Sequence, residues 1–484
     1  MVTFLICLAL LVAAYFTYGR FLERLAGIDP DNPTPAQRLV DGVDYVQLPR
    51  WRIFLIQLLN IAGLGPIFGA VLGAAYGPLA FLWITLGGIF MGAAHDFMAG
   101  VISLRHDGAS VPETAGFYLG NSVKIFMRLF SAGLMILVGA VFLSQPANLI
   151  AARIEAPALQ TIAFGSTSWL LLIILVAILL YYIAATLLPV DKIIGRFYPV
   201  FGCVLLLMAL GILAVLLFGG KYTIPEFSTF RNCIADPDKF PIVPMLFTTI
   251  ACGAISGFHA TQSPIMARCI GNERDSRMIF YGAMIAESII ALIWAAIAMS
   301  FWGGVEGLNA AIAEYNGSAA VMIDIIANTT LGRTMATLVI LGVIACAITS
   351  GDTAFRSARL IVADFMGVEQ RSLRKRIYIS VPLFALGLLI IFALPFQAMW
   401  SYFAWMNQTL AAVTLWMIVA YLRRHGRAIW AALLPALIMT YVCGSYIFVS
   451  PLMFGMENRT AAYILGGIVT VAVAAAVYLK IRKR

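Results

Sequence analysis

Charged residues are scarce in this chain. Only 11% of its 484 residues are Asp, Glu, Lys or Arg, whereas 62% are hydrophobic. Soluble domains carry roughly 25% charged residues, so the composition excludes an ordinary soluble protein. Because a membrane-spanning helix needs about 20 apolar residues, the length leaves room for a dozen or so spans. The chain therefore predicts an all-α polytopic membrane protein.

Side chains in catalytic patterns are also lacking. The four His residues, at positions 95, 106, 259 and 425, are scattered, and the seven Cys residues form no CxxC pair. No HExxH or Ser-His-Asp pattern points to an enzyme, and no repeated filter motif points to a channel. A metal site built from His95, Asp96 and His259 is conceivable, but no ligand spacing supports one. We expect no enzymatic activity and no cofactor other than a coupling ion.

The formal net charge of +9 reflects membrane topology rather than nucleic-acid binding. With the N-terminus outside, 26 of the 32 Lys and Arg residues fall in cytoplasmic segments, which is a strong positive-inside signal. We predict an integral protein of the bacterial cytoplasmic membrane, with the C-terminus in the cytoplasm and lipid as its partner. The expected spans, thirteen in all, lie at about 2–18, 53–75, 79–101, 123–150, 168–188, 196–219, 242–267, 278–302, 333–351, 377–394, 398–421, 428–450 and 461–479.

Two of these spans are interrupted by residues that weaken a helix. The second span contains Asn60-Ile-Ala-Gly-Leu-Gly-Pro66, and the seventh contains ACGAISGFHATQSP at 251–264. Glycine adds backbone freedom and proline removes a hydrogen-bond donor. One interpretation is that these are kinked helices whose small residues let neighbours approach. Two such spans in corresponding positions of two halves favour the substrate site of a secondary transporter.

The interrupted spans lie five spans apart, which divides the chain into two similar units. Residues 53–219 form the first five-helix unit and residues 242–421 the second. An odd number of spans per unit inverts the second unit in the membrane, so we predict an inverted repeat. Residues 1–52 supply an extra helix and a cytoplasmic loop that we expect to be partly unstructured. Residues 428–484 supply two accessory helices and a basic tail.

Four motifs carry a family resemblance over most of the chain: GLGPIFGAVLGAAYGP (63–78), GAAHDF (92–97), GAISGFH (253–259) and ITSGDTAFRSARL (348–360). Together they resemble the carbon starvation protein A (CstA) family of membrane carriers, which is implicated in uptake of peptides and pyruvate. The family is placed near the amino acid–polyamine–organocation superfamily, so the resemblance implies a LeuT-like fold with two discontinuous helices. It also implies import of a small carboxylate-bearing nutrient, whether a peptide, an amino acid or pyruvate.

The interruptions are the candidate substrate site. Free N–H groups at the N-terminus of a half-helix bind a carboxylate well. Glycines allow close approach of a ligand, and polar side chains near the seventh-span interruption add donors. The candidate substrate-binding residues are Gly63, Gly65, Ser256, Gly257, His259, Thr261 and Gln262.

Two classes of coupling site compete. Intramembrane ionisable residues suggest proton coupling, and the candidates are His95, Asp96 and Glu287. Adjacent helical residues point about 100° apart, so we expect His95 and Asp96 to meet different neighbours rather than each other. The alternative role is a polar network that fixes helix packing. The abundance of buried titratable residues, and the resemblance, favour protons.

For sodium, the resemblance implies ligands on the ninth span, where Thr349, Ser350 and Asp352 are candidates because hard cations prefer oxygen ligands. The alternative is that Ser-Gly-Asp-Thr simply ends the helix. The sequence does not define an oligomeric state.

The predicted topology can be tested by cysteine labelling. Cysteines introduced at Arg38 and Arg427 should react with an impermeant thiol reagent only from the cytoplasm. Cysteines introduced at Asp236 and Glu314 should react only from outside. Labelling of the Arg38 and Asp236 positions from the same side would rule out the inverted repeat.

Overall fold

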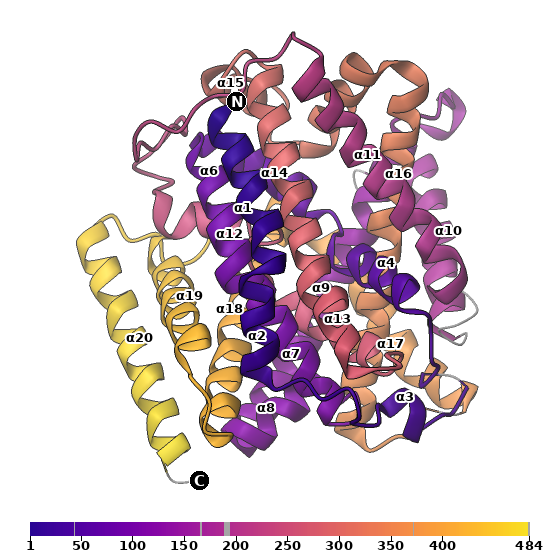
Figure 1. Cartoon of the computed structure of the whole chain (residues 1–484). Helices are drawn as coiled ribbons and strands as arrows, with labels where there is room; N and C mark the ends of the chain where they lie inside the picture. The colour runs from indigo at the N-terminus through magenta and orange to yellow at the C-terminus, as the bar shows by residue number, and fades with distance from the viewer. Residues whose placement is uncertain (43, 165–166, 188–193, 371, 483–484) are drawn as a thin grey trace.

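The computed structural model describes residues 1–42, 44–164, 167–187, 194–370 and 372–482, which form a bundle of long helices (Figure 1). The two termini lie at opposite ends of this bundle. Among the described residues, ten helices are long and apolar enough to cross a membrane. A bent pair, Arg50–Ile61 and Gly65–Tyr76, is an eleventh candidate if it counts as one span.

Helices dominate both halves, and η denotes short 3-10 or π segments. The N-terminal half comprises α1 (Val2–Phe16), α2 (Tyr18–Ala26), α3 (Pro35–Arg38), α4 (Arg50–Ile61), η1 (Gly65–Gly69), α5 (Ala70–Gly73), η2 (Ala74–Tyr76), α6 (Leu79–Leu82), η3 (Trp83–Gly92), α7 (Ala93–Arg105), α8 (Val111–Leu119), α9 (Asn121–Ala151), η4 (Pro157–Leu159), the hairpin strands β1 (Ile162–Phe164) and β2 (Thr167–Ser168), α10 (Trp169–Leu187) and α11 (Ile194–Phe218).

The C-terminal half continues the same architecture. It comprises η5 (Ile242–Leu246), α12 (Phe247–Thr249), α13 (Gly257–Ala267), η6 (Glu273–Asp275), η7 (Arg277–Gly282), α14 (Ala283–Phe301), α15 (Val305–Glu314), α16 (Ala319–Met366), α17 (Leu373–Ala393), α18 (Phe396–Arg424), α19 (Trp430–Val449) and α20 (Arg459–Arg482).

The nearly all-helical membrane fold is confirmed, whereas the count of thirteen spans stays a prediction. The expected fifth span corresponds to a shorter apolar helix, Trp169–Ala185. The expected seventh span is divided among η5, α12 and α13, each too short to cross a membrane alone. The N-terminal loop, expected to be partly unstructured, contains α2 and α3, and most of its other described residues have no helix or strand.

Both predicted interruptions are present. Helix α4 ends at Ile61, and the chain turns by 54° before the Gly65–Tyr76 segment. In the seventh span, helical structure stops at Thr249 and resumes at Gly257. Gly253, between them, has a φ of +93°, a conformation that favours glycine because it has no Cβ. The glycines therefore set where each span breaks.

The ninth span differs from its prediction. Helix α16 continues to Met366 and does not end at the Ser-Gly-Asp-Thr run, so helix termination there is wrong. Within this run the Thr353 hydroxyl donates to the carbonyls of its own helix, whereas the Ser350 hydroxyl donates to carbonyls of α4. The irregularity in α16 lies earlier, at Gly332, whose φ is +71°. The polar run is therefore in mid-helix.

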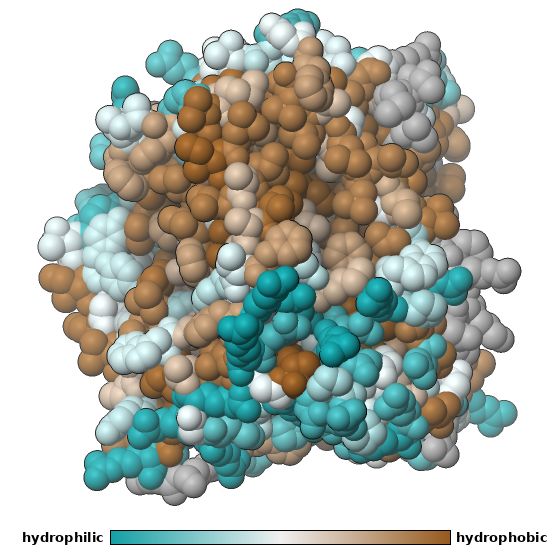
Figure 2. Space-filling model, viewed as in Figure 1, coloured by the Kyte–Doolittle hydropathy of each residue, from teal (hydrophilic) through white to brown (hydrophobic). Residues whose placement is uncertain are grey.

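The surface agrees with a membrane protein (Figure 2). A broad hydrophobic band covers the middle of the visible face, and hydrophilic residues gather at the end that carries the C-terminus. At that end the loop after α2 is fastened to the core, because Asn32 Nδ2 donates to Glu273 Oε2 at 3.1 Å. Arg105 forms an ion pair with the same carboxylate, and Glu273 is fully buried.

Candidate functional site

The two interruptions pack directly against each other at the centre of the bundle. A Cβ atom on Gly65 would collide with the side chain of Cys252, and one on Gly69 would lie 2.8 Å from Thr249 O. A Cβ on Gly63 would lie 2.7 Å from the ring of Phe142. Glycine is required at these positions because any side chain would fill the space where the broken spans meet.

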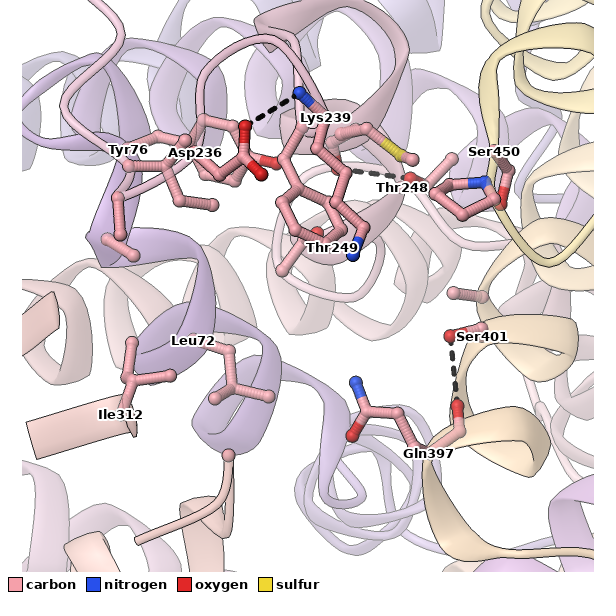
Figure 3. A pocket seen from close by; sticks show the side chains of 18 of the residues that line it. Leu72, Tyr76, Asp236, Lys239, Thr248, Thr249, Ile312, Gln397, Ser401 and Ser450 are labelled. Carbon is pink, nitrogen blue, oxygen red and sulfur yellow. Dashed lines mark hydrogen bonds between the residues drawn. The ribbon is translucent and has the colours of Figure 1, made fainter. Parts of the chain in front are cut away.

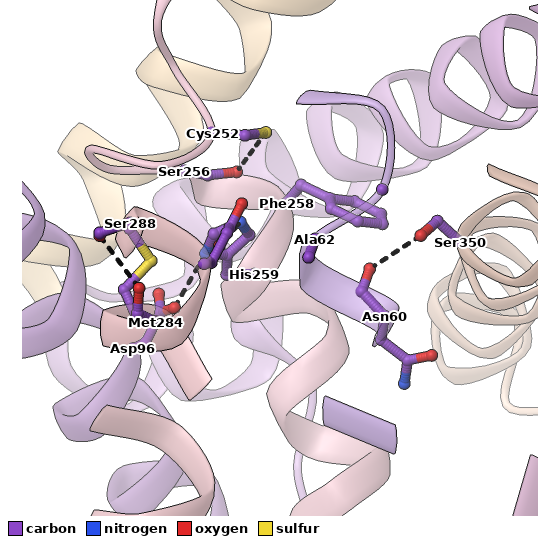
Figure 4. Close-up of polar contacts among 12 residues, drawn as sticks. Asn60, Ala62, Asp96, Cys252, Ser256, Phe258, His259, Met284, Ser288 and Ser350 are labelled. Atoms are coloured by element: carbon purple, nitrogen blue, oxygen red, sulfur yellow. Dashed lines mark hydrogen bonds and ion pairs between the residues drawn. The ribbon is translucent and has the colours of Figure 1, made fainter. Parts of the chain in front are cut away.

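A titratable cluster lies beside the second interruption (Figure 4). Asp96 on α7 bridges two imidazoles: its Oδ1 is 2.8 Å from His95 Nδ1, and its Oδ2 is 2.8 Å from His259 Nδ1. The expectation that His95 and Asp96 do not pair is therefore wrong. The Cα–Cβ bonds of the two residues diverge, but the side-chain torsion angles bring the imidazole and the carboxylate together. Asp96 also meets a second helix, as expected.

The cluster extends to a third helix through the other face of His259. Its Nε2 lies 3.3 Å from Glu287 Oε2 on α14, and the side chains of His95, Asp96, His259 and Glu287 are all fully buried. Placing an unbalanced charge in a low-dielectric interior is expensive, so such a cluster is stable only near electrical neutrality. The number of protons bound to the cluster therefore depends on the charges that surround it.

A side chain from another helix caps the N-terminus of α13. Ser256 occupies the N-cap position but does not bond its own helix. Instead, Asn407 on α18 accepts a hydrogen bond from the Phe258 N–H at 2.6 Å. The same side chain exchanges hydrogen bonds with the Ser256 hydroxyl at 3.0 to 3.1 Å. The predicted carboxylate-binding end of α13 is thus held by an amide oxygen.

The remaining candidates on α13 face the interior of the bundle. The Thr261 hydroxyl donates to Phe258 O at 2.6 Å and receives a hydrogen bond from Gln262 Nε2 at 3.0 Å. Gly257 lies so close to α18 that a Cβ there would collide with the backbone N of Ala411. These residues surround the second interruption, whereas Gly63 and Gly65 belong to the first.

Only one of the three candidate sodium ligands faces the first interruption. The Ser350 hydroxyl donates to the carbonyls of Leu59 and Asn60, both at 3.2 Å. The Thr349 hydroxyl bonds only to carbonyls of its own helix, at Ala345 and Cys346. Asp352 accepts a hydrogen bond of 2.5 Å from the hydroxyl of Tyr198 on α11.

The position beside Ser350 is taken by a thiol. The Sγ of Cys346 lies 2.7 Å from Ala62 O and 3.6 Å from Gly63 O. A neutral thiol is a poor ligand for a hard cation, which prefers oxygen. The carbonyl oxygens at this interruption therefore face one hydroxyl and one thiol.

A cavity of about 500 Å³ is seen in Figure 3. Part of its lining comes from α15, which lies at the same end of the bundle as the N-terminus in Figure 1. The cavity is also lined by residues of the loop before η5, the end of the first broken span, α12 and α18. Sequence reasoning missed these residues because nothing in a loop sequence indicates which core helices it covers. The polar and charged lining residues include Tyr76, Asp236, Lys239, Thr248, Gln397 and Ser401.

A much smaller cavity, of about 20 Å³, lies between α13 and α16, against Thr261 and Ser357. On α7, Arg105 forms hydrogen bonds with Glu273, with Tyr421 and with the backbone at Ala26, which connect segments that are far apart in the sequence. The larger of the two cavities is therefore the one beside the loop before η5.

Comparison with protein families gives one matching model. The model described as "Carbon starvation protein CstA" matches residues 1–175 and 149–326. An uncharacterised membrane protein of Haemophilus influenzae is 43% identical over 349 residues, which cover 64% of this chain and 94% of that protein.

Two relatives with named activities are more distant. The peptide transporter CstA of Bacillus subtilis is 26% identical, over 91% of this chain and 88% of that protein. The pyruvate/proton symporter BtsT of Escherichia coli is 27% identical, over 58% of this chain and 46% of that protein.

A solved structure confirms the fold. The crystal structure of MhsT in complex with L-phenylalanine matches with a TM-score of 0.57 and 16% identity, over 89% of this chain and 99% of that one. At this identity the likeness concerns the fold alone, and it is the LeuT-like fold that the family resemblance implied.

The contact between the two interruptions can be tested at Gly65. Gly65→Val should abolish transport while folded protein remains in the membrane, and Gly65→Ala should reduce transport at least about tenfold, because overpacking costs roughly 1–3 kcal/mol. Gly133→Ala is the matched control, since the nearest atom to a Cβ there is Met406 Cε at 3.8 Å. Uptake by reconstituted protein measures the effect. Substrate affinity unchanged in Gly65→Val would remove this interruption from the site.

Proposed function

Because the chain belongs to the carbon starvation protein CstA family, we propose that it is a proton-coupled secondary transporter that imports a small carboxylate-bearing nutrient. The candidate nutrients are a peptide, an amino acid or pyruvate. The relatives named as a peptide transporter and as a pyruvate/proton symporter support this range. Transport proceeds by alternating access around the meeting point of the two interruptions.

The observation that carries this proposal is the buried cluster of His95, Asp96, His259 and Glu287. Its members come from α7, α13 and α14, and His259 lies in the first turn after the second interruption. A change in the position of α13 alters the distances within the cluster, and these distances set its electrostatic balance. Proton binding and helix movement are therefore coupled at His259.

The substrate site lies where the broken spans meet, with entry from the 500 Å³ cavity. The residues proposed to bind substrate are those around the interruptions, namely Gly63, Gly65, Ser256, Gly257, His259, Thr261 and Gln262. A half-helix N-terminus carries a partial positive charge that suits a carboxylate. All of the candidate nutrients present that group.

A sodium-coupled carrier of the same fold is the second candidate. It is favoured by Ser350, whose hydroxyl faces the carbonyls of Leu59 and Asn60 in the manner of a cation site. The thiol of Cys346 beside it, and the turning away of Thr349 and Asp352, make this site poorer in oxygen than a hard cation prefers. We therefore favour protons.

Variants of the two ion sites separate the candidates. In proteoliposomes with imposed gradients, a pH gradient should drive uptake of pyruvate, L-alanine or dialanine. Asp96→Asn should lower this uptake at least about tenfold and flatten its pH dependence, because one carboxylate of the cluster can no longer bind or release a proton.

Ser350→Ala should have a smaller effect, and Thr349→Ala serves as the control because its hydroxyl bonds only within α16. Uptake that requires sodium, ignores the pH gradient and is lost in Ser350→Ala would establish the sodium-coupled carrier instead.

A further inference from the structure

Two adjacent amide side chains of α18 span the interruption of the seventh span. Gln408 Nε2 donates to Phe247 O at 3.0 Å, on the α12 side. Asn407 Oδ1 accepts from the Phe258 N–H at 2.6 Å, on the α13 side. Both side chains are fully buried. Helix α18 therefore holds both ends of the broken span.

The acceptor at the α13 end resembles the group that a substrate would bring. The Phe258 N–H is a donor, so the amide atom facing it must be the oxygen of Asn407. An amide oxygen and a carboxylate oxygen have the same planar geometry, but a carboxylate makes the stronger bond to an N–H group because it is charged. A substrate carboxylate can therefore replace the amide at the same N–H group.

Unpartnered polar atoms lie next to this end of α13. Gln262 Oε1 and Glu287 Oε1 are buried and have no hydrogen-bond partner among the described residues, whereas His259 Nε2 and Glu287 Oε2 face each other at 3.3 Å. The Sγ atom of Cys252 lies within 4.8 Å of an imidazole nitrogen of His259 and of a carboxylate oxygen of Glu287. It also lies 3.8 Å from Asn407 Nδ2. A polar ligand that reached the N-terminus of α13 would find the two buried oxygens of Gln262 and Glu287 without a hydrogen-bond partner among the described residues.

Helix α18 also forms part of the entry route. Gln397, Trp400 and Ser401 line the 500 Å³ cavity (Figure 3). Two turns further along, α18 packs so tightly on Gly257 that a Cβ there would collide with its backbone. Helix α18 therefore connects the wall of the cavity to the N-terminus of α13.

We propose that Asn407 is a specificity-determining residue whose amide oxygen holds the place of the substrate carboxylate until the substrate displaces it. This inference rests on the proposed function and deepens it. Substrates with a carboxylate can exchange with the amide at the Phe258 N–H, whereas uncharged analogues gain nothing from the exchange. Displacement also breaks the hydrogen bond between α18 and the α13 side of the interruption, while the Gln408 bond to Phe247 O remains, so carboxylate binding loosens the contact of α18 with α13.

The competition between amide and substrate makes the inference testable by affinity. Asn407→Ala removes the resident acceptor and leaves the Phe258 N–H for the ligand alone. The dissociation constants of pyruvate, L-alanine and dialanine are measured on the purified full chain by calorimetry. For whichever of these probes the wild-type protein binds, the constant should fall about tenfold in Asn407→Ala, the size expected when one competing hydrogen bond is removed.

Gln408→Ala is the matched control. This substitution removes a neighbouring hydrogen bond to the same interruption, but it does not remove the amide oxygen that competes with the substrate carboxylate. The dissociation constant of the probe from Gln408→Ala should therefore not fall. A purely structural role for Asn407 predicts the same result for both variants. An unchanged or higher dissociation constant in Asn407→Ala would overturn the inference.

A second variant, Asn407→Asp, tests the inference if Asn407→Ala does not fold. Asn407→Asp keeps the shape and places a carboxylate at the α13 end, so probe binding should weaken about tenfold or more through like-charge competition. Binding as tight as in the wild type would refute the inference. The amides of the probes, pyruvamide and L-alaninamide, should be affected less by either variant.

The two proposals fail in different ways. If wild-type protein accumulates a probe but Asn407→Ala and Asn407→Asp bind it like the wild type, only the role of Asn407 is wrong. If wild-type protein neither binds nor accumulates any probe, the proposed function is wrong and the role of Asn407 is wrong with it.

Discussion

The structure depends on one constraint: a broken helix inside a membrane must have its backbone polar groups satisfied by protein, because lipid offers no partners. Other helices meet this need here. Ser350 of α16 bonds the carbonyls of the first interruption. Trp83 Nε1 donates to Ile250 O of the second, at 2.9 Å, and Asn407 caps the half-helix that follows. The backbone groups at the interruptions are therefore satisfied by side chains of neighbouring helices rather than by the regular hydrogen bonds of a helix.

The position of the buried charges follows from the same constraint. Non-helical backbone at the centre of the bundle leaves polar atoms there, and ionisable side chains are tolerated in a membrane interior only where protein or water faces them. Asp96, His259 and Glu287 gather beside the second interruption, where they bond each other. The proposed proton-coupling site and the proposed substrate site both lie against α13, so a movement of this half-helix would alter both.

Much of this arrangement could be predicted from the sequence, for physical reasons. Clusters of glycine and proline such as Gly63, Gly65 and Pro66 weaken a helix, so both interruptions are visible in the residues themselves. Side-chain pairing is not visible in this way. The contact between His95 and Asp96 depends on rotamers, and the continuation of α16 past Thr353 depends on hydroxyls that bond their own helix.

Contacts between distant helices were the hardest to predict. Asn407 is recognisable as a polar residue in an apolar span, but its role as a cap depends on how α18 lies against α13. The lining of the 500 Å³ cavity depends on where the loop with Asp236 and Lys239 folds back. Neither the register between two helices nor the path of a loop follows from local sequence preferences.

Binding of the coupling proton by the buried imidazole–carboxylate cluster should accompany the binding of substrate. This linkage is tested most directly by mixing purified protein with pyruvate, L-alanine or dialanine in weakly buffered solution that contains a pH indicator dye. Proton uptake is expected upon addition of the transported substrate, and it should be absent with the corresponding amide and lost in Asp96→Asn. Substrate binding without any change in bound protons, or proton uptake that persists unchanged in Asp96→Asn, would contradict this linkage.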